Sequence, residues 1–294
     1  MSAIPLSIDH TTLAARDLDL LVESFRRLGL NPVYGGAHSN GVTHMAVLGF
    51  PDGSYIELIS TLRPGQNSPW WDQAIRTSAG PCAWAIQAKG IDEEARRLAG
   101  LGIPVRGPLM LSRLRPDGVR IEWELAFPDE KEPGSTLPFL IEDITPRELR
   151  VQPAPAVAQA GLIGIRKVVL GVGSLSAAAR RFEELYGWPQ PEIEEQPGFG
   201  ARLASFAGQP VILAEPIDLD GWLAQRLDRL GETPCAFVLA CRKLTEVSPN
   251  LGLSNPTVWF GTLLAWLPLS GDLRVAVQQM SAHAERGRQE KEAL

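Results

Sequence analysis

Apolar residues recur along the chain in a fixed order, and that order appears twice. Segments 8–28 and 165–185 each begin with an apolar run typical of a strand. Each continues with apolar residues spaced i, i+4, i+7 and i+10, which form one face of an amphipathic helix. The run Pro-Cys-Ala-Trp-Ala-Ile at 81–86 returns as Pro-Cys-Ala-Phe-Val-Leu at 234–239. The chain is therefore predicted to hold two copies of one unit.

Each copy divides again into two modules of the order strand, helix and three strands. In the first copy, turn signals separate the strands expected in each module. These signals are Gly35-Gly36, Pro51-Asp52-Gly53 and Arg115-Pro116-Asp117-Gly118. In the last module of the second copy, Pro249 and Asn255-Pro256 interrupt the expected helix.

This order of elements predicts an α+β fold with two tandem domains, near residues 1–150 and 160–283. Each domain would pair two βαβββ modules as a cupped, mostly antiparallel half-barrel sheet. A Pro- and Ala-rich stretch at 146–160 would join the domains, and the charged residues from Ala284 onward would form a frayed tail.

Composition narrows the class of partner. The chain has 294 residues, 45% hydrophobic and 21% charged, which is the balance of a folded globular protein. Its net charge is −6 and no basic run exceeds a pair, so nucleic acid is not expected as a partner and a small molecule is. The longest apolar stretch, 258–269, is too short to span a membrane. Three cysteines without CxxC spacing and the absence of a secretory leader favour a cytoplasmic location.

Two side chains stand out for their chemistry. His10 lies in the first expected strand, and Glu57 lies in the last strand of the same module. A carboxylate in an apolar strand must face solvent, pair with a base or bind a metal, because burying it alone costs several kcal/mol. His10 and Glu57 could reach across the cup to a divalent ion such as zinc, iron, manganese or nickel. Alternatively, they could pair directly or contact water.

The chain also resembles a known family. Ile8-Asp9-His10, Gly35-Gly36-Ala37-His38 and Tyr55-Ile56-Glu57-Leu58 are similar to the glyoxalase-like branch of the vicinal oxygen chelate (glyoxalase/bleomycin resistance/extradiol dioxygenase) superfamily. The segments 112–118 and 138–142 with Trp123 resemble later motifs of the same branch. The resemblance covers residues 4–145 well. It implies the paired-module fold but fixes no reaction, because the superfamily includes lyases, isomerases, dioxygenases, thiol transferases and binding proteins.

In that superfamily, residues from the first and last strands of two paired modules hold a divalent metal. The resemblance therefore implies His10 and Glu57 as ligands. The second module offers no ligand near Trp84 and only Glu142 in its last strand, so the full set of four is absent. His38 and His44 are candidate substitutes, although both flank a Gly-rich turn and could be ordinary hairpin residues.

Other residues have two interpretations. Arg113 is a candidate anchor for a carboxylate or phosphate group, or else a surface arginine. Trp84 and Trp123 could line the ligand pocket or pack in the core. In the second copy, Lys167 replaces His10 and Ile212 replaces Glu57, so no metal is expected there. That copy would stiffen the first or mediate a homodimer, and Lys167 would be solvated or bind an anion.

The leading hypothesis is a metal-dependent enzyme of the lyase, isomerase or dioxygenase type that acts on a small oxygenated or carbonyl compound. The metal would act as a Lewis acid. Glu57 and Arg113 are the candidate catalytic residues. The alternatives are a binding protein that sequesters a small molecule without chemistry and a scaffold whose second copy mediates dimerisation.

Overall fold

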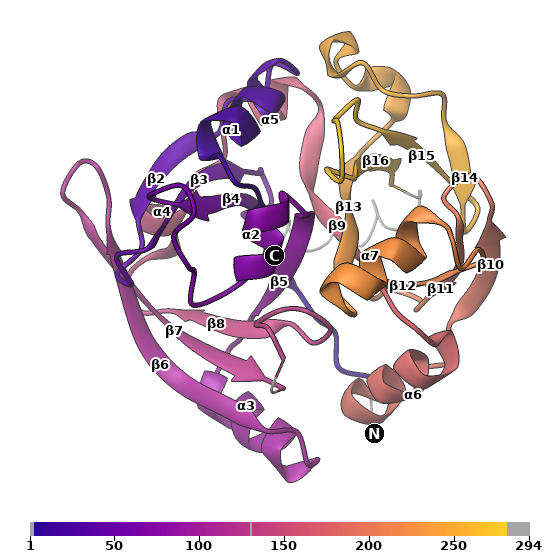
Figure 1. The fold of residues 1–294 in the computed structure, drawn as a ribbon, viewed down its shortest axis with the longest axis horizontal. Helices are drawn as coiled ribbons and strands as arrows, with labels where there is room; N and C mark the ends of the chain where they lie inside the picture. The colour runs from indigo at the N-terminus through magenta and orange to yellow at the C-terminus, as the bar shows by residue number, and fades with distance from the viewer. Residues whose placement is uncertain (1–2, 130, 281–294) are drawn as a thin grey trace, which may run out of the picture.

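Two curled eight-stranded sheets lie side by side in the computed structural model, which describes residues 3–129 and 131–280 (Figure 1). The strand orders are β2-β3-β4-β1-β5-β8-β7-β6 and β10-β11-β12-β9-β13-β16-β15-β14. Each second-sheet strand thus occupies the place of its first-sheet counterpart. The parallel neighbours are β1–β4, β5–β8, β12–β9 and β13–β16, and the other pairs are antiparallel. The predicted duplication and the α+β half-barrel class are confirmed.

The strands of the first sheet are β1 (Ile8–Ala14), β2 (Val33–Ala37), β3 (Thr43–Gly49), β4 (Tyr55–Thr61), β5 (Gly80–Gln87), β6 (Val105–Leu114), β7 (Arg120–Pro128) and β8 (Phe139–Asp143). Those of the second are β9 (Leu162–Gly171), β10 (Glu192–Gln196), β11 (Ala201–Ser205), β12 (Val211–Pro216), β13 (Pro234–Cys241), β14 (Thr257–Trp259), β15 (Thr262–Trp266) and β16 (Val275–Gln279). The helices are α1 (Leu18–Arg26), α2 (Asp72–Thr77), α3 (Ile91–Gly100), α4 (Arg147–Arg150), α5 (Pro155–Gln159), α6 (Leu175–Tyr186) and α7 (Trp222–Leu230).

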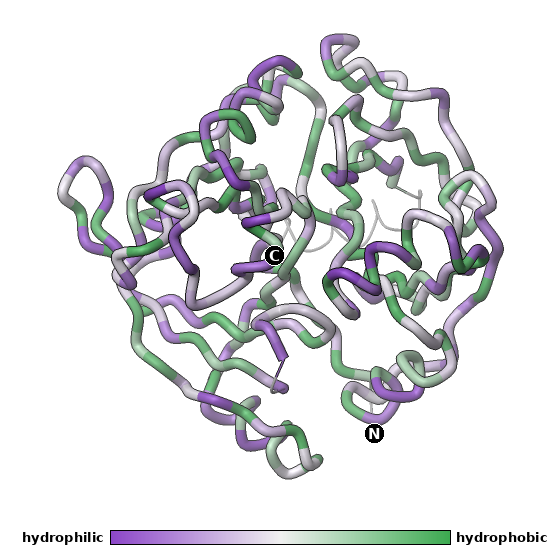
Figure 2. The backbone as a smooth tube through the Cα atoms, in the orientation of Figure 1, coloured by the Kyte–Doolittle hydropathy of each residue, from purple (hydrophilic) through white to green (hydrophobic). Residues whose placement is uncertain are grey.

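The crossover helices α1 and α6 form as their sequences predict. Asp17 caps α1 by accepting a hydrogen bond from the backbone N–H of Leu20, and Ser174 caps α6 by accepting one from Ala177. Their apolar stripes pack on the outer face of each sheet. Figure 2 shows hydrophobic stretches along the strands and hydrophilic segments on the helices and outer turns.

Four helices lie where the sequence pattern predicted none. The joining stretch contains α4 and α5, and each sheet has an extra short helix, α2 or α7, that packs its apolar residues on the concave face. The helices α2, α4 and α5 have six, four and five residues, too few for a period of 3.6 residues to stand out. The helix α7 has nine residues, as many as α1, and the sequence-based prediction missed it. In the last module, two single 3₁₀ turns, Leu244–Glu246 and Pro249–Leu251, take the place of a full helix, as the prolines predicted. The predicted frayed tail lies outside the described residues.

The pairing of β1 with β4 positions the candidate site. In this parallel pair, His10 is opposite Tyr55 and Thr12 is opposite Glu57. Alternate residues of a strand share a face, as do residues directly opposite in adjacent strands. All four side chains therefore project from the same face of the sheet. A bulge opposite β5 falls at Asp9, which is an extra residue between Ile8 and His10.

The two sheets meet along β5 and β13 near the middle of Figure 1. Arg226 of α7 is 2% exposed and donates hydrogen bonds to backbone carbonyls of both sheets, those of Pro81 in β5 and Pro234 in β13. Asp52 donates its backbone N–H to the carbonyl of Ile163. Within the described residues, no helix is long and apolar enough to cross a lipid bilayer.

Candidate functional site

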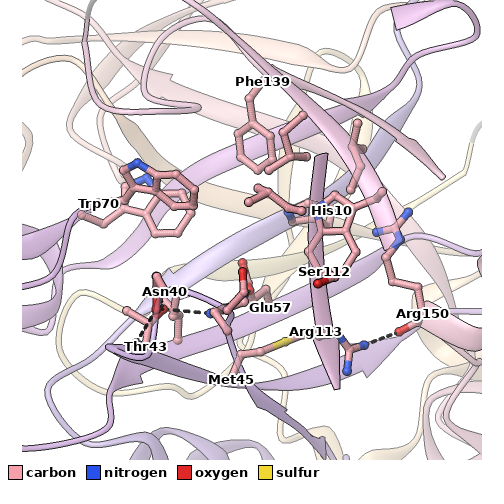
Figure 3. A pocket seen from close by; sticks show the side chains of 18 of the residues that line it. His10, Asn40, Thr43, Met45, Glu57, Trp70, Ser112, Arg113, Phe139 and Arg150 are labelled. Carbon is pink, nitrogen blue, oxygen red and sulfur yellow. Dashed lines mark hydrogen bonds and ion pairs between the residues drawn. The ribbon is translucent and has the colours of Figure 1, made fainter. Parts of the chain in front are cut away.

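A cavity of about 80 Å³ lies in the concave face of the first sheet (Figure 3). Its wall is mainly aromatic and aliphatic, and several polar side chains from different strands meet in it. The apolar residues are Met45, Tyr55, Ile59, Trp70, Trp71, Leu111, Trp123, Leu125, Phe139 and Ile141. The polar and charged residues are His10, His38, Ser39, Asn40, Thr43, Glu57, Ser68, Ser112, Arg113 and Arg150. The cavity thus brings together polar groups from segments that are far apart in the sequence.

His10 is held by its neighbour Asp9. The Nδ1 atom of His10 lies 2.7 Å from Oδ1 of Asp9. Burial favours the neutral form of Asp9, but the charge and hydrogen bonds of Arg150, together with His10, outweigh it and hold the pKa of Asp9 well below its usual range. Asp9 is therefore a carboxylate, and the N–H group at Nδ1 of His10 donates a hydrogen bond to it. The neutral imidazole then has its lone pair on Nε2, for which the described residues provide no partner.

The ring of His10 is also fixed by packing. It stacks on Tyr55 with a centroid distance of 4.6 Å and meets the edge of Phe139 at 5.2 Å. Behind it, Arg150 binds both oxygens of Asp9 at 2.9 Å, and Arg147 also donates to Asp9. Because the ring is clamped on both sides, the direction of Nε2 is set before any ligand arrives.

Glu57 pairs with a different histidine. Its Oε1 lies 3.2 Å from Nε2 of His38, and its Oε2 accepts a hydrogen bond from Oγ1 of Thr12 at 3.1 Å. Burial would raise the pKa of Glu57, but the hydrogen bond and charge of His38 outweigh burial and lower it. The other ring nitrogen of His38, Nδ1, lies 2.8 Å from Oγ1 of Thr43. A direct His10–Glu57 pair, one of the sequence alternatives, is therefore not formed.

Arg113 is a buried cation without a carboxylate partner among the described residues. It is 5% exposed, and its guanidinium donates to the backbone carbonyls of Gly35 and Arg150, the latter at 2.7 Å. Its Nε is buried with no partner, and burial lowers the pKa of the group. A backbone bridge between His38 and Arg113 joins the two outer edges of the sheet. Arg113 therefore lies in the cavity wall, where the edge strands β2 and β6 approach each other.

Three candidates lie outside the cavity. Glu142 accepts hydrogen bonds from the backbone N–H groups of Gly90 and Ile91, so it caps α3 on the outer face. His44 is opposite Ser60 and next to Tyr34, and burial lowers its pKa. Trp84 is fully buried in the core on the helix side, whereas Trp123 lines the cavity.

Among the described residues, the donor atoms around the cavity do not form a metal site. Both oxygens of Glu57 and both ring nitrogens of His38 already have protein partners, and Nδ1 of His10 faces Asp9. In the part of the chain that the structure describes, no three His, Cys, Asp or Glu side chains form a group that could hold a metal ion. The residues present do not fit a metal of the kind that the family resemblance implied.

The second sheet has no equivalent site. Lys167 is opposite Val238 where His10 is opposite Ala85, and Ile212 is opposite Val169 where Glu57 is opposite Thr12. Its concave face is filled by a packed aromatic cluster. The cluster contains Phe199, Trp222, Trp259 and Trp266. The two halves thus differ in the chemistry of their concave faces.

Sequence reasoning missed three groups in the site. Asp9 was visible beside His10, but an alternating strand would place its side chain on the opposite face, and only the bulge overrides this. Arg150 lies in the joining stretch, 141 residues from Asp9, and no local pattern links them. The pair Trp70-Trp71 was a signal, since large apolar side chains gathered in a polar segment can mark a ligand-binding surface.

The comparison with protein families gives a match to the glyoxalase-like domain over residues 8–187. This chain belongs to the glyoxalase-like family. The match extends past the first sheet into α6 of the second half, and it confirms the resemblance to the vicinal oxygen chelate superfamily. A comparison with curated proteins found no match.

Solved structures share the fold of this glyoxalase-like protein. A hypothetical protein from Staphylococcus aureus is 13% identical, with a TM-score of 0.59, over 94% of this chain and 100% of the other. A mutant of 4-hydroxymandelate synthase from Streptomyces coelicolor is 13% identical, with a TM-score of 0.58, over 94% and 92%. The Mn(II)-bound glyoxalase from Novosphingobium aromaticivorans is 11% identical, with a TM-score of 0.57, over 95% and 83%. At these identities the similarity concerns the fold alone.

Proposed function

We propose that this glyoxalase-like protein is an enzyme that transfers a proton to or from a small, largely apolar compound carrying a carbonyl or hydroxyl group, with His10 as the acid–base residue. One observation carries the proposal. Asp9 holds Nδ1 of His10 at 2.7 Å, which leaves Nε2 as the free basic atom of a residue that lines the cavity.

The role of His10 follows from this geometry. A carboxylate on one ring nitrogen fixes the tautomer and stabilises the imidazolium that forms when the other nitrogen takes a proton. His10 would remove a proton from the carbon next to a substrate carbonyl, and the electron pair would move to the carbonyl oxygen. Return of the proton to a neighbouring atom would complete an isomerisation, and loss of a leaving group would complete an elimination.

The surroundings support an anionic intermediate. The charge of Arg113 is not neutralised by an ion pair within the described residues, so it would stabilise negative charge developing on the substrate oxygen. The aromatic and aliphatic wall provides an environment of low dielectric constant, which would strengthen this interaction. Glu57 would act as a positioning residue, because it holds His38 in the turn between β2 and β3. No step is assigned to a metal.

Hydrogen exchange in heavy water tests the proposal. Small aryl ketones and 2-hydroxy ketones are incubated with the protein in D₂O, and deuterium entry next to the carbonyl is followed by NMR. We expect exchange with the wild type and a loss of about 10²–10⁴ in rate for His10→Gln. His44→Gln is the matched control, because His44 lies outside the cavity, and it should exchange at the wild-type rate.

Other outcomes would contradict the proposal. Equal exchange rates in wild type and His10→Gln would remove His10 from the reaction. Tight ligand binding without exchange would favour a sequestering protein. Stoichiometric metal in protein purified without chelator, lost in both His10→Ala and Glu57→Ala, would replace acid–base catalysis by metal chemistry.

A further inference from the structure

A second cavity lies between the two sheets and is separate from the candidate active site. It has a volume of about 650 Å³ and is lined by the start of β1, the end of β5, the β3–β4 and β11–β12 turns and the first half of β9. Its lining is more polar than that of the first cavity. Arg147, Arg166 and Lys167 contribute three cationic groups, and Asp52 contributes the carboxylate.

Two of these cations lack a counter-charge. The ammonium of Lys167 donates to the backbone carbonyl of Gln209, and Nε of Arg166 donates to the side-chain carbonyl of Gln278 at 3.0 Å. Both acceptors are neutral. Within the described residues, neither Arg166 nor Lys167 forms an ion pair, although both are partly buried.

The remaining charged groups of the cavity are engaged elsewhere. Oδ1 of Asp52 accepts hydrogen bonds from the backbone N–H of Ser54 at 2.9 Å and from its hydroxyl, and it shows no ion pair with a described cation. Arg147 donates to Asp9 and Asp143, so its charge is already matched. Burial and the neighbouring charge of Arg166 lower the pKa of Lys167 from 10.5 to about 8, as expected for two adjacent cations in a partly buried site.

We propose that this cavity is a binding site for a small oxyanion, a phosphate or carboxylate group, held between Arg166 and Lys167. Two adjacent, partly buried cations repel each other, and their desolvation is unfavourable unless an anion neutralises them. Arginine offers a planar fork for such a group, and lysine adds a point charge with free donors. The cavity leaves room for the rest of a small molecule.

The position of the site in the repeat supports it. Arg166 and Lys167 occupy the places that Asp9 and His10 occupy in the first copy, and each pair includes a residue at the β-bulge. The first copy presents an acid and a base there, and the second presents two cations. The proposal is independent of proton transfer at His10, because the two cavities share no lining residue.

Calorimetric titration with inorganic phosphate and with acetate, at constant ionic strength, tests the site. We expect saturable binding of one of them, and the one that binds identifies phosphate or carboxylate as the recognised group. Lys167→Met and Arg166→Met should each weaken binding by about tenfold or more, as expected for losing one charge-assisted contact. Lys89→Met removes an exposed lysine outside both cavities and should bind like the wild type.

Two results would overturn the proposal. One is that neither anion binds saturably, and the other is that both variants bind as tightly as the wild type. If a variant does not fold, as judged by circular dichroism, the wild type supplies the readout. NMR titration of the Lys167 side chain should then show a rise in its pKa on addition of the bound anion, and an unchanged pKa would refute the site.

Discussion

Oδ1 of Asp9 lies 2.7 Å from Nδ1 of His10, although adjacent residues of a regular strand point to opposite faces. The β-bulge at Asp9 makes the contact possible, because it adds one residue to β1 opposite β5. The bulge recurs at Arg166 in the second copy, where the two side chains are both cations. One backbone irregularity thus supports an acid–base pair in one half and an uncompensated pair of charges in the other.

Asp9→Asn should destabilise the protein by about 3 kcal/mol, because Arg150 is buried and would keep Asp143 alone as a carboxylate partner among the described residues. The pKa of Asp9 lies well below 3.8, since Arg150 and His10 outweigh burial. The stabilisation by Asp9 is therefore complete above pH 3.8 and is lost as the pH falls towards the folded-state pKa. Urea unfolding from pH 7 to pH 2.5 should show the wild-type and variant stabilities converging in acid.

Asp220→Asn is the control for this experiment. Asp220 is exposed, so its substitution should change the free energy of unfolding by less than about 0.5 kcal/mol. A constant gap between wild type and Asp9→Asn at every pH would show that the carboxylate charge is not the source of the stability.

The two candidate tryptophans should separate stability from binding. Trp84 is fully buried in the core on the helix side, so Trp84→Ala should lower the free energy of unfolding by about 3–5 kcal/mol. Trp123 lines the cavity, so Trp123→Ala should cost less and weaken the binding of a small aromatic probe such as indole. Urea unfolding and calorimetry measure the two effects. Equal losses of stability would place Trp123 in the core.

The sequence predicted more of the fold than of the site. The repeat and the order of strands and helices in each module follow from periods of 2 and 3.6 residues, which are local. The partners of these side chains depend on register and on distant segments. His38 reaches Glu57 through the fold of the β2–β3 hairpin, and Arg150 reaches Asp9 across 141 residues.

Glu142 shows the same limit. Its strand was predicted, but a shift of one residue exchanges the two faces of a strand, and the sequence leaves that register open. In the structure, Glu142 faces outward and caps α3 at Gly90 and Ile91. Residue type and spacing thus identified a carboxylate that needs a partner, while the tertiary structure determined which partner it has.

Gly164→Ala should weaken the packing between the two halves. A Cβ atom at Gly164 would lie 1.7 Å from Oδ2 of Asp52, so the side chain or the strand must move, at a cost of about 1–3 kcal/mol. Gly100→Ala is the opposite case. Apart from its chain neighbours and the backbone of α3, no atom lies within 4 Å of its Cβ position, and alanine should stabilise the helix by about 0.5–1 kcal/mol.

A double-mutant cycle with Asp52→Ala identifies the cause. Thermal or urea unfolding of Gly164→Ala, Asp52→Ala and the double variant should give a favourable coupling, because removing the carboxylate removes the clash. Additive effects would mean that Gly164 is needed for its backbone rather than for the close approach of Asp52.

Lys167 should make the protein more stable as the pH rises through the alkaline range. Its pKa in the folded chain is lowered from 10.5 to about 8 by burial and by Arg166. Between these two values the unfolded chain binds more protons than the folded chain, so the free energy of unfolding increases with pH. Besides Arg166, the charged residues that line the same cavity are Arg147 and Asp52, and neither forms an ion pair with Lys167.

Lys167→Met removes this titration. The free energy of unfolding of the variant minus that of the wild type should therefore fall steadily from pH 8 to pH 10.5. Taking the difference cancels the titration of tyrosines and cysteines, which both proteins share. An anion bound beside Lys167 would raise its pKa and flatten the profile. A difference that does not change with pH would mean that the ammonium of Lys167 is solvated, and it would remove the charge imbalance on which the proposed oxyanion site depends.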